Sequence, residues 1–144
     1  MEFALVFPLF FMLVLAMFTG GVAYNAKLSL AEAGREGARY GATLPLAPAR
    51  PVADWLAEVA MVTEGSAGGE LGAGVAGRYV CVALFDGTGA PATRRVEDGA
   101  TPPAVLAEPC FADSRPPFEP RVQVVVRRQR TLEALVFTRD LTLQ

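Results

Sequence analysis

The feature that most constrains this chain is an apolar stretch at its N-terminus. Residues Phe3 to Phe18 include no charged and no strongly polar side chain, and apolar or small residues continue to about Tyr24. As a helix, these about 22 residues would be ~33 Å long, enough to cross the hydrocarbon core of a bilayer. The stretch is longer than the core of a cleaved secretory signal, and no basic residue precedes it. The sequence therefore predicts one transmembrane helix over residues 1–24.

The helix is predicted to continue beyond the membrane, because residues 25–43 contain no proline. Two pairs of residues in this part, Glu32 with Arg35 and Glu36 with Arg39, have the i,i+3 spacing of helical ion pairs. The helix should end at Leu44, since the proline that follows disfavours helical backbone there. Residues 25–50 are thus expected to form a projecting helix followed by a proline-rich elbow.

Small residues recur along one face of the projecting helix. Ala31, Gly34, Ala38 and Gly41 are spaced by three and four residues. Such a stripe would allow another helix to approach closely, inside or outside a membrane. The alternative is that the stripe only reflects the general richness of this chain in alanine and glycine.

Residues 51–144 are expected to form a small α+β domain with an antiparallel sheet. Strands are predicted at 78–85, 93–97, 121–130 and 140–144, and the first is apolar on both faces, as in a covered central strand. Residues 131–138 are expected to connect the last two strands. A second helix is predicted from Val52 to about Glu64, and its apolar face would comprise Trp55, Leu56, Val59, Ala60 and Val62.

The two cysteines, Cys81 and Cys110, both lie far beyond the membrane segment. If this part of the chain is outside the cytoplasm, the pair can oxidise and remain a disulfide. Closing the loop would then stabilise the fold by about 3–4 kcal/mol on the chain-entropy model. The alternative is two reduced, buried thiols.

No arrangement of residues with a catalytic pattern is found. The chain contains no histidine, so it lacks the commonest general base and the commonest metal ligand. Two cysteines without histidine do not make a usual zinc site, and their spacing is not that of a thiol oxidoreductase. The glycine-rich stretch 65–77 lacks the Lys-Ser/Thr ending of a phosphate loop. We expect no enzyme activity, no cofactor and no metal.

Two further surfaces have open interpretations. Arginines gather near the C-terminus, but acidic residues dilute their charge and no aromatic residues alternate with them. A solvated sheet face is therefore favoured over contact with anionic partners or nucleic acid. The predicted connection at residues 131–138 is apolar. It either caps the core or forms a partner surface, since exposed apolar patches usually mark contacts. Its large apolar residues are Leu132, Leu135, Val136 and Phe137.

Two segments resemble a known family. Residues 2–9, EFALVFPL, resemble the start VEFALVLPL of TadE-like proteins from tight-adherence (Tad) pilus systems, and residues 33–42, AGREGARYGA, resemble that family's AAREGARYAA. The two segments lie at the family's separation and together cover residues 1–42. A valine-rich strand, an apolar connection and the ending LTLQ are similar to the family's C-terminus.

The resemblance implies a pilin-like minor subunit, or pseudopilin, with no reaction of its own. In that family a leader is removed and a glutamate lies near the start of the mature helix, which is the position of Glu2. Because no basic leader precedes Glu2, the leader was already removed, the gene start lies upstream, or the chain is unprocessed. The helix-packing residues would be Glu2, Phe3, Pro8, Ala31, Gly34, Arg35, Glu36, Ala38, Arg39 and Gly41.

The implied partners are other minor pilins, the major pilin, the inner-membrane assembly platform and the lipid bilayer. No nucleic acid and no small-molecule substrate is expected. The C-terminal domain would be extracytoplasmic on a single-pass anchor and could be incorporated into a surface pilus. The alternative function is a membrane-anchored extracytoplasmic binding or adhesion protein that never enters a filament.

Overall fold

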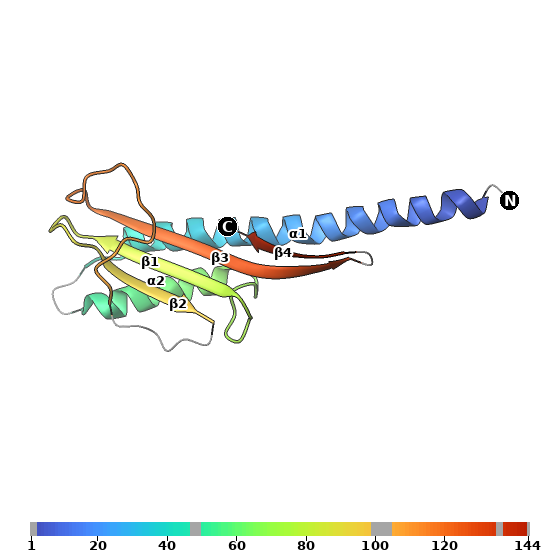
Figure 1. Cartoon of the computed structure of the whole chain (residues 1–144). Helices are drawn as coiled ribbons and strands as arrows, with labels where there is room; N and C mark the ends of the chain where they lie inside the picture. Colours follow the sequence, from blue (N-terminus) through green and yellow to red (C-terminus); the bar gives the residue numbers. More distant parts are fainter. Residues whose placement is uncertain (1–2, 47–49, 99–104, 135–136, 144) are drawn as a thin grey trace.

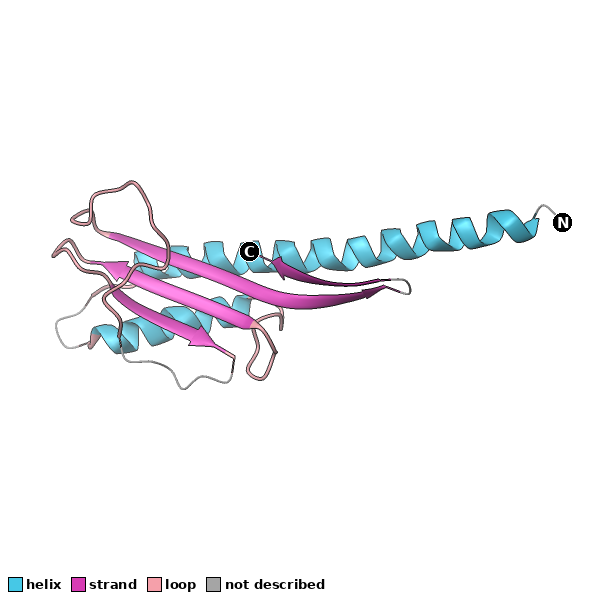
Figure 2. Cartoon of the chain, viewed as in Figure 1, coloured by secondary structure: helices cyan, strands magenta, loops and turns pink. Residues whose placement is uncertain are grey.

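The computed structural model describes residues 3–46, 50–98, 105–134 and 137–143. Its elements follow one another as α1 (Phe3–Thr43), α2 (Val52–Ser66), β1 (Arg78–Phe85), β2 (Ala92–Glu97), β3 (Arg121–Ala134) and β4 (Phe137–Leu143) (Figure 1). The long α1 carries an α+β domain at its C-terminal end, and both helices lie on one side of the sheet (Figure 2). The predicted fold class is confirmed.

Helix α1 is a single continuous helix of 41 residues, about 60 Å long. Pro8 lies within it, near the N-terminal end, where a missing N–H removes only one backbone bond. The last turn closes with the N–H of Leu44 donating to the carbonyl of Tyr40 at 2.9 Å. Pro45 then prevents further helical backbone, as the sequence predicted.

Helix α2 begins directly after Pro51, whose φ of −58° suits the start of a helix. It extends two residues beyond the predicted end at Glu64. Four of the predicted apolar-face residues are buried, but Val62 is only partly buried and Thr63 takes a core position instead. The buried hydroxyl of Thr63 is satisfied there, because it donates a hydrogen bond to the carbonyl of Val59 at 2.8 Å. The buried residues are Trp55, Leu56, Val59, Ala60 and Thr63.

The four strands form one antiparallel sheet in the order β2-β1-β3-β4. β1 lies between β2 and β3 and is buried over most of its length, so the prediction of a covered central strand is confirmed. Val80, Val82 and Leu84 belong to the core that also contains residues of both helices, among them Leu30 of α1. An ion pair between Arg128 and Glu70 joins β3 to the loop that follows α2.

The prediction that residues 131–138 only connect two strands is wrong. β3 continues to Ala134 and β4 already begins at Phe137, so most of this stretch is paired backbone. The register pairs Leu132 with Arg139 and Ala134 with Phe137. Pairing of the two strands satisfies backbone groups that a free connection would leave to water.

The opposite face of the sheet is covered by the proline-rich segment before β3. Cys81 of β1 and Cys110 of this segment form a disulfide with their Cα atoms 5.7 Å apart. Thr93 of β2 exchanges two backbone hydrogen bonds of 2.8 Å with Leu106. The amide of Gln123 accepts from the N–H of Cys110 at 3.2 Å, so the disulfide and the polar contacts hold the same segment.

Asp113 connects this segment to β3. Arg121 donates to its carboxylate from Nη2 at 3.0 Å, and Gln123 Nε2 donates to it at 2.9 Å. Desolvation alone would raise the pKa of Asp113, but the hydrogen bonds from Gln123 and from the N–H of Arg115, with the charge of Arg121, outweigh it and lower the pKa. The carboxylate is therefore the form that the fold favours.

Candidate functional site on the long helix

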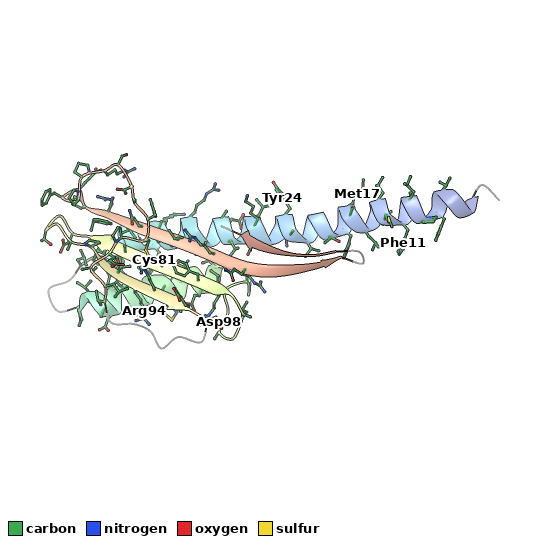
Figure 3. The ribbon with its side chains drawn as sticks, in the orientation of Figure 1. Phe11, Met17, Tyr24, Cys81, Arg94 and Asp98 are labelled. Atoms are coloured by element: carbon green, nitrogen blue, oxygen red, sulfur yellow. A yellow bond between two sulfur atoms is a disulfide. The ribbon has the colours of Figure 1, made fainter. Side chains whose placement is uncertain are left out.

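The N-terminal half of α1 has most of its surface bare. Leu9, Met17 and Phe18 are each at least 70% exposed, and Phe11 and Met17 are seen to project from the helix in Figure 3. The described part of the chain contains one helix, over Val6–Thr43, that is long and apolar enough to cross a membrane. The described side chains of the domain therefore leave this apolar surface for lipid or for other helices to cover.

The C-terminal half of α1 packs on its own domain through a narrow face. Ala26, Leu30 and Ala33 are buried, and Gly37 and Gly41 continue the same face at spacings of four. This periodicity follows one side of a helix.

Two glycines on this face lie where a side chain would be crowded, Gly37 much more than Gly41. A Cβ atom on Gly37 would lie 2.0 Å from Oγ1 of Thr63, and one on Gly41 would lie 3.2 Å from the ring of Trp55. Gly37 was not among the predicted packing residues. Its i,i+4 spacing from Ala33 and Gly41 indicates that Gly37 lies on the packed face. This pattern is hard to recognise in a chain that is rich in alanine and glycine.

The predicted stripe of small residues does not form one surface. Gly41 is buried, and a Cβ atom on Gly34 would lie 3.6 Å from Val126 of β3, so these two positions face the domain. Ala31 is exposed and Ala38 is partly buried. Only the alanines therefore remain accessible to another helix, and their role in assembly stays a prediction.

The charged residues of the predicted helix-packing set point away from the domain core. Arg35, Glu36 and Arg39 are exposed. The expected pairs of Glu32 with Arg35 and of Glu36 with Arg39 are not among the ion pairs within 4.0 Å in the described part of the chain. These charges are thus exposed on the side of α1 that faces away from the domain.

Tyr40, which follows these charges, ties α1 to α2. Its hydroxyl donates to the carboxylate of Glu58, which also accepts from Nη1 of Arg50 at 2.9 Å. The hydrogen bond to Glu58 is the main reason why the pKa of Tyr40 is raised. Part of the motif that carries the family resemblance therefore has a structural role within the chain.

The remaining predicted residues lie at the ends of the described segments. Glu2 is outside the described residues, Phe3 begins α1, and Pro8 is exposed within it. Of the predicted partner surface, Leu135 and Val136 are outside the described residues, while Leu132 lies in β3 and Phe137 begins β4. The interpretation of these residues as a partner surface stays a prediction.

A shallow groove between α2 and β2 has a volume of about 240 Å³ and is bordered by Met61, Arg94 and Val96. Glu64 and Arg78, which also border it, form an ion pair of 3.3 Å with each other. Within the described residues, no group of three or more His, Cys, Asp or Glu side chains is placed to hold a metal ion. The long helix is therefore the candidate site.

The fold and the bare helix define a class of protein: a small α+β domain carried on one long helix with an apolar, uncovered end. Residues 1–39 match the family model of TadE-like proteins. This match confirms the resemblance for the N-terminal helix, while the likeness at the C-terminus stays a prediction. No curated protein and no solved structure matches the chain.

Proposed function

We propose that this chain is a non-catalytic, membrane-anchored minor pilin of a Tad-type pilus, in which α1 is both the anchor and the assembly element. The match of residues 1–39 to TadE-like proteins supports the relation to this pilus system. Within that system the chain would act at initiation of assembly or at the pilus tip, in contact with other minor pilins, the major pilin and the membrane platform.

The observation that carries the proposal is the division of α1 into a packed and a bare part. The domain covers one face from Ala26 onward, whereas the apolar half before it is mostly exposed. Exposed apolar area on this scale is unfavourable in water, and a bilayer removes it from water. On assembly, the helices of other subunits would replace the lipid.

The outward face of the projecting half suits such helix contacts. Ala31 leaves room for a close approach, and both signs of charge are present around it. A neighbouring helix can therefore meet a small contact position flanked by groups that discriminate partners by charge. The exposed charged residues on this half are Lys27, Glu32, Arg35, Glu36 and Arg39.

The disulfide supports an extracytoplasmic domain. Cys81 and Cys110 are joined in the structure, and such bonds form and persist in oxidising compartments. A domain on the cytoplasmic side would meet reducing conditions that oppose this bond. The C-terminal domain would thus lie outside the cytoplasm, on a single-pass anchor.

The assembly role can be tested by counting surface pili in a strain from which the gene is deleted. Deletion should abolish or strongly reduce them, and the unaltered gene should restore them. Ala31→Trp should fail to restore them, because the large ring blocks close approach at an exposed helix position. Ala112→Trp is the matched control, since Ala112 is also exposed but lies on the covering segment, and it should restore piliation.

Normal piliation in the deletion strain would contradict the proposal and favour an anchored binding or adhesion protein. Equal numbers of pili with the two tryptophan variants would show that the exposed face of α1 at Ala31 is not needed for assembly. Membrane-fraction levels of both variants distinguish failed assembly from failed folding.

A further inference from the structure

The β3–β4 hairpin extends beyond the rest of the domain, in the direction of the N-terminal half of α1. β1 pairs with the first half of β3, from Arg121 to Arg128, and β4 pairs with the second half, from Arg128 to Ala134. In Figure 1 the second half and β4 project past β1 and β2, toward the N-terminal end of α1. The hairpin is therefore the part of the domain that extends furthest in the direction of the N-terminal end of α1.

The contacts between α1 and β3 show how far the hairpin reaches. Val122 lies next to Gly41 and Val126 next to Gly34, so the strand runs toward the N-terminus of the helix. Ala134 is eight residues beyond Val126, or about 26 Å along a strand, which corresponds to about 17 residues of helix. The end of β3 should thus reach the level of Met17, as it does in Figure 3.

The solvent exposure of α1 side chains agrees with how far the hairpin extends along the helix. Among residues 6–24, whose side chains are described, only Leu15, Thr19 and Ala23 are partly shielded from solvent. They are spaced by four residues and continue the face of Ala26 and Leu30, which packs on the domain. The domain-facing side of α1 therefore continues well into the apolar half.

The hairpin cannot enter the hydrocarbon core of a bilayer. β4 is an edge strand that pairs only with β3 among the described strands, so its other edge presents backbone groups that lipid cannot satisfy. The hairpin sequence also contains Glu133, Arg139 and Asp140, whose charges are costly in hydrocarbon. The part of α1 at the level of the hairpin must then lie outside the hydrocarbon as well.

We propose that the β3–β4 hairpin rests on the lipid headgroups and sets how deeply α1 inserts, so that the hydrocarbon ends near Met17 rather than at Tyr24. This inference rests on the membrane anchoring proposed above. Tyr24 would then stand about 10 Å above the hydrocarbon boundary. The charge-free run from Phe3 to Phe18 is about 24 Å long as a helix, which a bilayer accommodates by local thinning.

The composition of the hairpin fits an anionic phospholipid surface. Its sequence contains the apolar residues Leu132 and Phe137, which suit the acyl boundary, and the cation Arg139, which suits lipid phosphates. The register pairs Leu132 with Arg139, which brings both kinds of residue to the same level of the hairpin. Apolar and cationic residues together are the combination found at bilayer interfaces.

Depth-dependent fluorescence quenching tests the proposal on the full chain in vesicles of phosphatidylcholine and phosphatidylglycerol. One additional tryptophan is placed at Phe11, Tyr24 or Thr138, while buried Trp55 gives a constant background. Lipids brominated in the acyl chain should quench Phe11→Trp, and a headgroup nitroxide should quench Thr138→Trp at least threefold more than Tyr24→Trp. Quenching of Tyr24→Trp by either lipid, with Thr138→Trp unquenched, would overturn the proposal.

The same measurement separates this inference from the proposed anchoring. An unquenched Phe11→Trp would mean that α1 does not insert, which would overturn both. In the Thr138→Trp background, Arg139→Glu should reduce headgroup quenching at least twofold in vesicles with phosphatidylglycerol. Arg115→Glu on the exposed covering segment is the control and should leave the quenching unchanged. Equal loss in both variants would contradict a specific role of Arg139.

Discussion

The two faces of the sheet are covered by different means. Toward the helices, Val80 and Val82 are buried against apolar side chains of α1 and α2. On the other face, an irregular segment covers Cys81 and is held by the disulfide and by the polar contacts of Thr93 and Gln123. A helix pairs its own backbone hydrogen-bonding groups, so it needs only an apolar face in order to pack on the sheet. An irregular segment leaves backbone polar groups unpaired and loses more conformational entropy when it is ordered, and specific bonds must offset both costs.

The largest effect is expected on the helix face. Leu30→Ala should lower the free energy of unfolding by about 3–4 kcal/mol, because it leaves a cavity in the core between α1, α2 and the sheet. Urea unfolding in detergent micelles, followed by the fluorescence of Trp55, would measure this loss. Leu28→Ala is the matched control, since Leu28 is 44% exposed on the same helix, and it should cost less than about 1 kcal/mol. Equal losses would mean that α1 does not pack as described.

On the opposite face, Cys81→Ser together with Cys110→Ser should cost about 3 kcal/mol, because the unfolded chain loses its cross-link. The covering segment should also become more sensitive to trypsin at the exposed Arg115. A reductant should reproduce the loss in the unaltered protein and add nothing to the double variant. Two free thiols in exported protein, found by mass analysis without reductant, would show that the two faces do not differ in this way.

A smaller effect would sharpen the comparison on the helix face. Gly37→Ala should cost about 2 kcal/mol, because the new methyl group would overlap Thr63. The matched control is Gly21→Ala in the apolar half, where a Cβ atom meets nothing within 4 Å and the same measurement should change little. Adding Thr63→Ala to Gly37→Ala should recover part of the lost stability. If no stability is recovered, the cost of Gly37→Ala does not arise from its contact with Thr63.

The sequence predicts the elements whose signals are strong and local. The apolar run, the proline after Leu44, the alternation in β1 and β3 and the pair of cysteines all led to features that the structure contains. The hairpin was missed because the stretch from Leu132 to Phe137 has no glycine, proline or asparagine to indicate a turn. Its pairing depends on the register with β3, which local patterns do not determine.

The candidate site was predicted only in part, for a related reason. Periodicity alone identified a stripe of small residues but did not show which side of α1 would meet the domain. Gly34 and Gly41 face the domain, while Ala31 is exposed, because the positions of α2 and β3 decide the orientation. Exposed Arg35 and Arg39 were expected to pair within the helix, but neither forms an ion pair among the described residues.

The antiparallel alignment of α1 and β3 has a mechanical consequence. A tension applied to the N-terminal half of α1 acts along the axis of the helix and nearly along the strand beside it (Figure 1). The contacts of Gly34 with Val126 and of Gly41 with Val122 would be loaded together, in shear, instead of one after another. The disulfide lies on the far face of the sheet, outside this line of force. The packing of one helix on one long strand would therefore determine how much tension along α1 the domain withstands before the helix and the strand separate.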